Sequence, residues 1–285
     1  MSAPALVLLL CGCADESALQ ITNLICKQMQ ELRPKLPIRA ASTTKPGLDP
    51  NSVASELVMN GFDEIVFVPL DLTRAVDPPP EVERQIDELR TTYPAQSIAI
   101  SHPIGPAVEL LTVLDLKLHQ TLSAARATEL DSLVLAASSV GDSRGSALLS
   151  RRVRQWRTHH HLPVQVAYAD NSGPSIAMAL AALRAQGRRS TAVGALFLAP
   201  DAAYNTLVEQ ALASGAIAVS APLGCDERLL DLIMYRYAVA ALAMPDETLA
   251  VNPETISPIL SRTSDSEPDL EYEPPRIEAL VAAAN

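Results

Sequence analysis

The residues best suited by type to bind a metal are three consecutive histidines, His159, His160 and His161. Imidazole is a common ligand of transition metals. The three histidines follow a run of arginines at the end of a stretch with helical periodicity, where the helix dipole stabilises cationic side chains. We therefore expect a solvated helix end here rather than a metal site.

A second stretch that could form a ligand site is 141–145, which carries two glycines where an apolar run meets a helical one. Two glycines alone are weak grounds for a phosphate site. The chain also has no P-loop, dinucleotide fingerprint, Cys-x-x-Cys pair or zinc-protease helix motif. We expect no nucleotide cofactor.

The four cysteines, Cys11, Cys13, Cys26 and Cys225, do not make a disulfide framework in a chain of 285 residues. The apolar run before Cys11 has no basic flank and is too short for an export signal. No stretch approaches the ~20 apolar residues of a membrane span. These features predict a cytoplasmic protein with no membrane partner.

Charge and composition argue against nucleic acid as a partner. The formal net charge is −11 and aromatic residues make up 4% of the chain, whereas nucleic-acid sites need clustered cations or stacking rings. From residue 246 onward, nine acidic residues stand against two arginines, with five prolines among them. Residues 246–285 are therefore predicted to form an acidic, disordered tail.

The elements that must position any site alternate regularly before this tail. Short apolar runs alternate with longer amphipathic ones, which is typical of an α/β protein with parallel sheets covered by helices. The predicted strands are 6–10, 37–41, 64–69, 97–101, 133–137, 164–168, 191–196 and 216–220. The predicted helices are 17–32, 51–60, 80–92, 106–122, 144–159, 174–187, 201–214 and 226–243.

This pattern occurs twice, with an offset near 126. Residues 5–9 match 132–136, and Asp15 falls on Asp142. We predict two similar halves, 1–125 and 126–245, each with a four-stranded parallel sheet flanked by helices. Because ligands of open α/β sheets bind beyond the carboxyl ends of the strands, we expect the site in a cleft where both sets of ends meet.

Four landmarks follow one another along residues 5–243. First, the first strand leads through a turn of small residues to Asp15, and second, residues 68–75 read Val-Pro-Leu-Asp-Leu-Thr-Arg-Ala. Third, a Pro-Ile/Leu-Gly turn opens the last helix of each half, and fourth, the last helix of the second half contains Arg236-Tyr237. With these landmarks the chain resembles the class II tetrapyrrole chelatases, especially the duplicated bacterial sirohydrochlorin cobaltochelatases and ferrochelatases. The resemblance implies a lyase that inserts Fe²⁺ or Co²⁺, as a substrate, into a modified tetrapyrrole of siroheme or cobalamin biosynthesis.

The resemblance also implies where the chemistry would lie. The family usually carries one histidine in the first turn and a second after the third strand; here Cys11 and Asp77 occupy those positions. Cys11, Asp77 and Glu81 are therefore the candidates to hold the metal, and Cys11 and Asp77 to take the pyrrole protons. Thiolate suits zinc or copper(I) better than cobalt or iron(II), and a free cysteine behind a strand is often only a small buried residue.

Three cations are candidates to bind the many carboxylates of a sirohydrochlorin-type macrocycle. Arg74 follows the third strand, where its guanidinium faces the expected cleft and can grip a carboxylate in bidentate fashion. Lys45 and Arg144 are weaker candidates on the same argument.

Two functions stay open at this point. One is a chelatase that works without the usual histidines. The other is a catalytically inactive relative that binds a tetrapyrrole or a metal, or serves as a partner for another enzyme of the tetrapyrrole pathway.

The predicted tail can be tested by deletion. Removing residues 246–285 is expected to leave the Tm unchanged within error, because the segment adds charge and proline but little apolar surface. Thermal unfolding followed by circular dichroism measures this. A fall of several degrees would show that the tail docks on the body.

Overall fold

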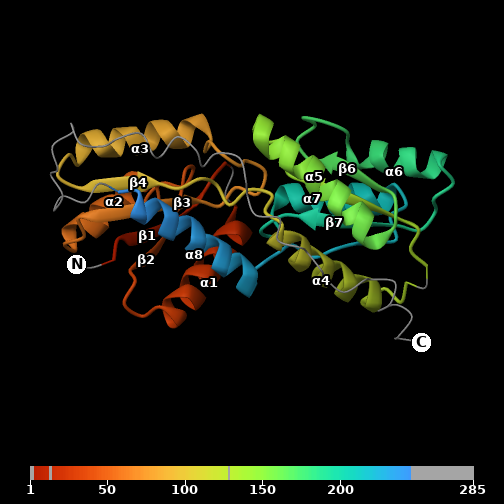
Figure 1. The fold of residues 1–285 in the computed structure, drawn as a ribbon, viewed down its shortest axis with the longest axis horizontal. Coiled ribbons are helices and arrows are strands. Elements are labelled where there is room, and N and C mark those ends of the chain that lie inside the picture. Colours follow the sequence, from red (N-terminus) through yellow and green to blue (C-terminus); the bar gives the residue numbers. More distant parts are fainter. Residues whose placement is uncertain (1–2, 13–14, 128, 245–285) are drawn as a thin grey trace, which may run out of the picture.

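Two parallel sheets covered by helices form the protein, and the computed structural model describes residues 3–12, 15–127 and 129–244 (Figure 1). The first half contains β1 (Ala5–Leu10), α1 (Glu16–Leu32), β2 (Ile38–Ser42), α2 (Pro50–Met59), β3 (Glu64–Pro69), α3 (Pro80–Thr92), β4 (Ser97–Ile100) and α4 (Glu109–Ala124). The second half contains β5 (Ser132–Ala137), α5 (Ser143–His160), β6 (Val164–Tyr168), α6 (Ile176–Ala185), β7 (Thr191–Leu196), α7 (Ala202–Ala213), β8 (Ala218–Val219) and α8 (Glu227–Leu242). The predicted tail, residues 246–285, lies outside the described residues.

The strand order is β2-β1-β3-β4 in one sheet and β6-β5-β7-β8 in the other, with every pair parallel. The predicted α/β class with two similar four-stranded halves is thus confirmed. All six residues of β1 and of β5 are buried, which explains why these strands are unbroken apolar runs. The helix α4 starts at Glu109, three residues later than predicted, after a turn in which Gly105 adopts a φ of 63°.

The last helix of each half packs on the sheet of the other half. α4 lies against β7 and β8, α8 lies against β3 and β4, and the two helices contact each other. Figure 1 shows α8, in blue, beside the red and orange elements of the first half. The hydroxyl of Tyr237 in α8 donates a hydrogen bond of 2.7 Å to the backbone oxygen of Pro4. The repeat units predicted at 1–125 and 126–245 therefore exchange one helix each in the packing.

Two aspartates at equivalent repeat positions join the halves near the strand ends. Asp142 caps α5 and also accepts hydrogen bonds of 3.2 Å from the backbone N–H groups of Ala75 and Val76. Asp15 caps α1 and accepts one of 3.0 Å from the backbone N–H of Ala202. Asp15 and Asp142 are equivalent in the repeat, as are Ala75 and Ala202, so the same contact is made twice with the roles of the halves exchanged.

Glycine permits the start of α5 to approach the loop after β3. A Cβ atom at Gly141 or Gly145 would overlap the backbone oxygen of Thr73. Gly141 also adopts a φ of 75°, in the region that favours glycine. The glycines of 141–145 therefore serve contact between the halves.

The contacts of Asp142 also set its pKa. Burial raises the pKa, but the backbone N–H groups of Gly145, Val76, Ala75 and Asp77 together lower it below the usual range of an aspartate. A lowered folded-state pKa contributes stability above the unfolded pKa of about 3.9. That contribution is present at neutral pH and is lost as the pH falls through the folded-state pKa.

We expect Asp142→Ala to lower the free energy of unfolding by about 2–4 kcal/mol at pH 7, of which about 1 kcal/mol reflects the lost cap and the rest the bonds from the other half. Urea unfolding measures the loss, which should begin to shrink below about pH 4, the unfolded pKa, and continue to shrink as the pH falls through the lower folded-state pKa of Asp142. Asp49→Ala is the matched control, because Asp49 caps α2 through Ser52 of the same half, and it should cost only about 1 kcal/mol. Equal losses in the two variants would contradict an inter-half role for Asp142.

Candidate active site in the inter-sheet cleft

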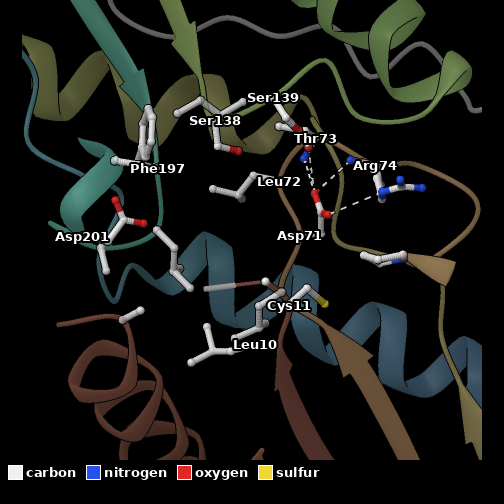
Figure 2. A pocket seen from close by; sticks show the side chains of 18 of the residues that line it. Leu10, Cys11, Asp71, Leu72, Thr73, Arg74, Ser138, Ser139, Phe197 and Asp201 are labelled. Atoms are coloured by element: carbon white, nitrogen blue, oxygen red, sulfur yellow. Dashed lines mark hydrogen bonds and ion pairs between the residues drawn. The ribbon is translucent and has the colours of Figure 1, made fainter. Parts of the chain in front are cut away.

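A cavity of about 460 Å³ lies where the carboxyl ends of the two sheets meet (Figure 2). Its wall is formed by the ends of β1 and β7 and by the residues that follow β3, β5 and β6. This is the place that the parallel strand pattern predicts for a ligand. The ionisable side chains that line it are Cys11, Asp71, Arg74, Glu81, Asp170 and Asp201.

The loop after β3 holds Asp71 and Arg74 in fixed positions. Asp71 Oδ1 accepts hydrogen bonds from the Thr73 backbone N–H (2.8 Å), the Thr73 hydroxyl (2.9 Å) and the Arg74 backbone N–H (3.0 Å). The Thr73 hydroxyl also lies 3.0 Å from Ser139 Oγ in the other half. Arg74 Nε is 4.0 Å from Asp71 Oδ2, and the Arg74 side chain is 27% exposed, so an anion in the cleft can reach it.

Cys11 directly follows β1 and is half-buried on the cavity wall. Its thiol donates a 3.6 Å hydrogen bond to the backbone oxygen of Leu9. Burial raises the pKa of the Cys11 thiol, the carboxylates of Asp71 and Glu81 raise it further, and Arg74 opposes them only in part. Cys11 is therefore a neutral thiol at physiological pH, and an ion that used it as a ligand would have to displace its proton.

The structure brings three of the predicted site residues, Cys11, Arg74 and Glu81, to one cavity. Glu81 lies in the first turn of α3. Asp77 is exposed and does not line this cavity, although its backbone N–H is near enough to Asp142 to help lower the pKa of that carboxylate. Its position in the sequence, between Arg74 and Glu81, does not carry its side chain to the wall.

The two weaker cation candidates lie outside the wall of the main cavity. Lys45 is half-buried and pairs with Glu16 at 3.4 Å. Arg144 lines a separate cavity of about 250 Å³, together with Arg152, Arg236 and His102.

Sequence reasoning did not identify Asp201 as a site residue. It caps α7 through the backbone N–H of Tyr204, and it lines the cavity on the side opposite Arg74 (Figure 2). Burial raises its pKa, and the neighbouring carboxylate of Asp15 adds to the increase. The repeat itself could have identified it, because an offset of 127 from Arg74 leads to Asp201.

The expectation of a solvated histidine tract is wrong for His160. His160 is 2% exposed, and its Nε2 lies 2.9 Å from Oδ1 of Asp115, which is 3% exposed. Among the three histidines, only His161, which ends the helix in a left-handed conformation, is exposed. His160 is buried because Asp115 of α4, in the first half, lies against the end of α5.

Comparison with known families decides the assignment. The sequence matches the family described as CbiX over residues 5–121 and 140–240, which cover most of both halves. The chain belongs to the CbiX family. The match confirms the predicted resemblance to the class II tetrapyrrole chelatases in their duplicated form.

Solved structures share the fold of this CbiX-family chain at low identity. SirB from Bacillus subtilis with Fe³⁺ is 16% identical, with a TM-score of 0.67 over 84% of this chain and 96% of its own. SirB from Bacillus subtilis subspecies spizizenii in complex with cobalt is 14% identical, with a TM-score of 0.65 over the same shares. CbiX, described as the terminal enzyme for biosynthesis of siroheme in denitrifying bacteria, is 16% identical, with a TM-score of 0.54 over 83% and 99%. A search of curated proteins gives no significant match.

The electrostatic coupling in the cleft can be tested by alkylation of Cys11. Because its pKa is raised, the thiolate is scarce, and iodoacetamide should modify Cys11 at least about tenfold more slowly at pH 8.5 than a free cysteine of pKa about 8.5. Glu81→Gln should speed the modification and Arg74→Gln should slow it. Peptide mapping by mass spectrometry, in a Cys13→Ser background, measures the rate. A rate that neither variant changes would show that the three groups do not share one cavity.

Proposed function

We propose that this CbiX-family protein binds a sirohydrochlorin-type tetrapyrrole in the inter-sheet cleft and inserts Fe²⁺ or Co²⁺ into it. The observation that carries the proposal is the cavity of about 460 Å³ at the strand ends of both sheets, which presents potential metal ligands, Cys11 and Glu81, together with the cation of Arg74. The similar structures of SirB were solved with Fe³⁺ and with cobalt, and the similar CbiX is described as a siroheme-forming enzyme.

Insertion requires groups that accept protons as well as groups that hold the ion. Two pyrrole N–H protons leave the macrocycle while the divalent ion gains its nitrogen ligands, so each turnover releases two protons. We assign this role to Glu81 and Asp201, two of the four carboxylates that line the cavity. The raised pKa of Asp201 brings it closer to the pH at which a general base is most effective.

The cations have a separate role in this proposal. Arg74 binds a peripheral carboxylate of the macrocycle, an interaction in which guanidinium gives two parallel hydrogen bonds. Lys45 and Arg144 reach carboxylates at the periphery, outside the cavity wall. Asp77 contributes as a ligand for the incoming ion at the exposed end of the same loop.

A second function, tetrapyrrole or metal binding without catalysis, is favoured by one observation. Among the described residues, no histidine lines the cavity, and the thiol at the position of the first family histidine is protonated. Such a protein would deliver a macrocycle or an ion to another enzyme of the tetrapyrrole pathway. In either case we propose that it acts in the cytoplasm; no helix in the described part of the chain has the length and apolar content needed to cross a membrane.

Anaerobic incubation with sirohydrochlorin and Fe²⁺ or Co²⁺, followed by absorbance, separates the two functions. We expect bands of metallated product to appear faster than the spontaneous rate. Cys11→Ala should abolish this activity, whereas Arg74→Gln should raise KM about 10- to 100-fold with a smaller effect on kcat, because a charged hydrogen bond of about 1.5–3 kcal/mol is lost. Lys45→Gln and Arg144→Gln should have weaker effects. Red-shifted bands of the bound macrocycle without product would instead identify a binding protein.

Restoring both family histidines, as Cys11→His with Asp77→His, distinguishes an inactive site from an altered one. Activity in the double variant and none in the parent would show a scaffold that has lost only its reactive groups. Equal activity in both would show that the native groups already perform the insertion, and the binding-only function would then be wrong.

A further inference from the structure

A second group of metal-binding side chains lies where α4 of the first half packs on α5 of the second. One ligand atom from each of Asp115, His159 and His160 lies within 4.8 Å of the other two. Asp115 and His160 are almost fully buried, at 3% and 2% exposure, and His159 is half-buried. These residues take no part in the chemistry proposed for the cleft.

One imidazole nitrogen of this cluster, on His160, has no hydrogen-bond partner. Oδ1 of Asp115 accepts a hydrogen bond of 2.5 Å from Trp156 Nε1 and lies 2.9 Å from His160 Nε2. The Nδ1 atom of His160 is buried without a hydrogen-bond partner, and so is Nδ1 of His119, one helical turn beyond Asp115 on α4. Buried polar atoms without partners are rare, and one explanation for them is an ion that the site is built to hold.

The donor set indicates the class of ion. Two imidazoles and one carboxylate suit Zn²⁺, Co²⁺, Ni²⁺ or Fe²⁺, which accept nitrogen and oxygen ligands together. A carboxylate has enough lone pairs to accept a hydrogen bond and bind an ion at the same time. The Trp156 N–H can therefore orient the ligand Asp115 without binding the ion itself. We propose that Asp115, His159 and His160 form a divalent transition-metal site that joins α4 to α5.

This site is separate from the cleft. The first turn of α5 contacts the loop after β3, which lines the cleft, whereas His159 and His160 form the last turn of the same helix. With a rise of 1.5 Å per residue, the 18 residues of α5 separate the two places by about 25 Å. An ion held here cannot reach a macrocycle in the cleft. Its effect is to hold α4, the exchanged helix, against the second half.

The only tryptophan of the chain reports on this site directly, because Trp156 is bonded to the proposed ligand Asp115. The full chain is stripped of metal with a chelator and titrated with Co²⁺ or Zn²⁺. We expect equilibrium dialysis to show that the protein binds an ion, and we expect Co²⁺ to quench the fluorescence of Trp156. The Tm should rise by several degrees when the ion is bound. An absence of quenching and of a Tm shift in excess metal would overturn the proposal.

Variants assign the bound ion to its ligands. His159→Gln and His160→Gln should each weaken Co²⁺ binding by at least about 100-fold, since even the loss of an outer-shell partner costs 10–100-fold. The matched control is His161→Asn, which changes the exposed neighbour and keeps a residue that tolerates the left-handed conformation; its affinity should equal that of the wild type. Quenching that survives both glutamine variants would show a polar packing cluster and no metal site.

Two further measurements keep the proposal testable. Circular dichroism shows whether His160→Gln folds. If it does not, the variant of the half-buried His159, His159→Gln, and the absorption bands of Co²⁺ bound to the wild type still show whether imidazole binds the ion. If Cys11→Ala abolishes metal binding while His159→Gln retains it, the ion lies in the cleft, and the site at Asp115 is wrong whether or not the protein is a chelatase.

Discussion

Each sheet of this protein is covered on one face by a helix from the other half. α8 covers β3 and β4, and α4 covers β7 and β8. The packing leaves no space for a side chain at Gly194 in β7, because a Cβ atom there would collide with Trp156 of α5 and contact Leu114 of α4 too closely. Because neither sheet can bury its apolar face alone, the two sets of strand ends are held at a fixed distance. The cleft between them depends on this exchange.

The cleft built on this framework is symmetric in its backbone and asymmetric in its chemistry. Asp15 and Asp142 make the same contact in the two directions, yet the repeat positions nearest the cavity differ, with Arg74 on one wall and Asp201 on the other. The first half supplies the thiol of Cys11, which is kept protonated first by burial and then by the nearby carboxylates, since both raise its pKa. The duplication thus preserved the residues that join the halves while the reactive residues diverged.

The sequence predicts the elements well because each central strand is buried on both faces, and apolar runs such as 6–10 and 133–137 stand out from the helices around them. It predicts the location of the cavity because parallel strands bring their carboxyl ends to one edge. It does not show the helix exchange, since a repeat of like units fits either arrangement. His160 was misassigned for this reason, as its partner Asp115 belongs to the exchanged helix. The solvent-facing side chain of Asp77 depends on loop contacts with Asp142 that no local pattern reveals.

The helix exchange also has a consequence for synthesis on the ribosome. The first sheet is complete at Ile100, but the helix that covers its β3–β4 face begins only at Glu227. At about 5–20 residues per second, roughly 6–25 s pass before that helix emerges. During this interval the nascent chain carries an apolar sheet face without its final cover. The helix that follows this sheet directly in the chain is α4. In the repeat, α4 is equivalent to α8, the helix that finally covers the exposed face.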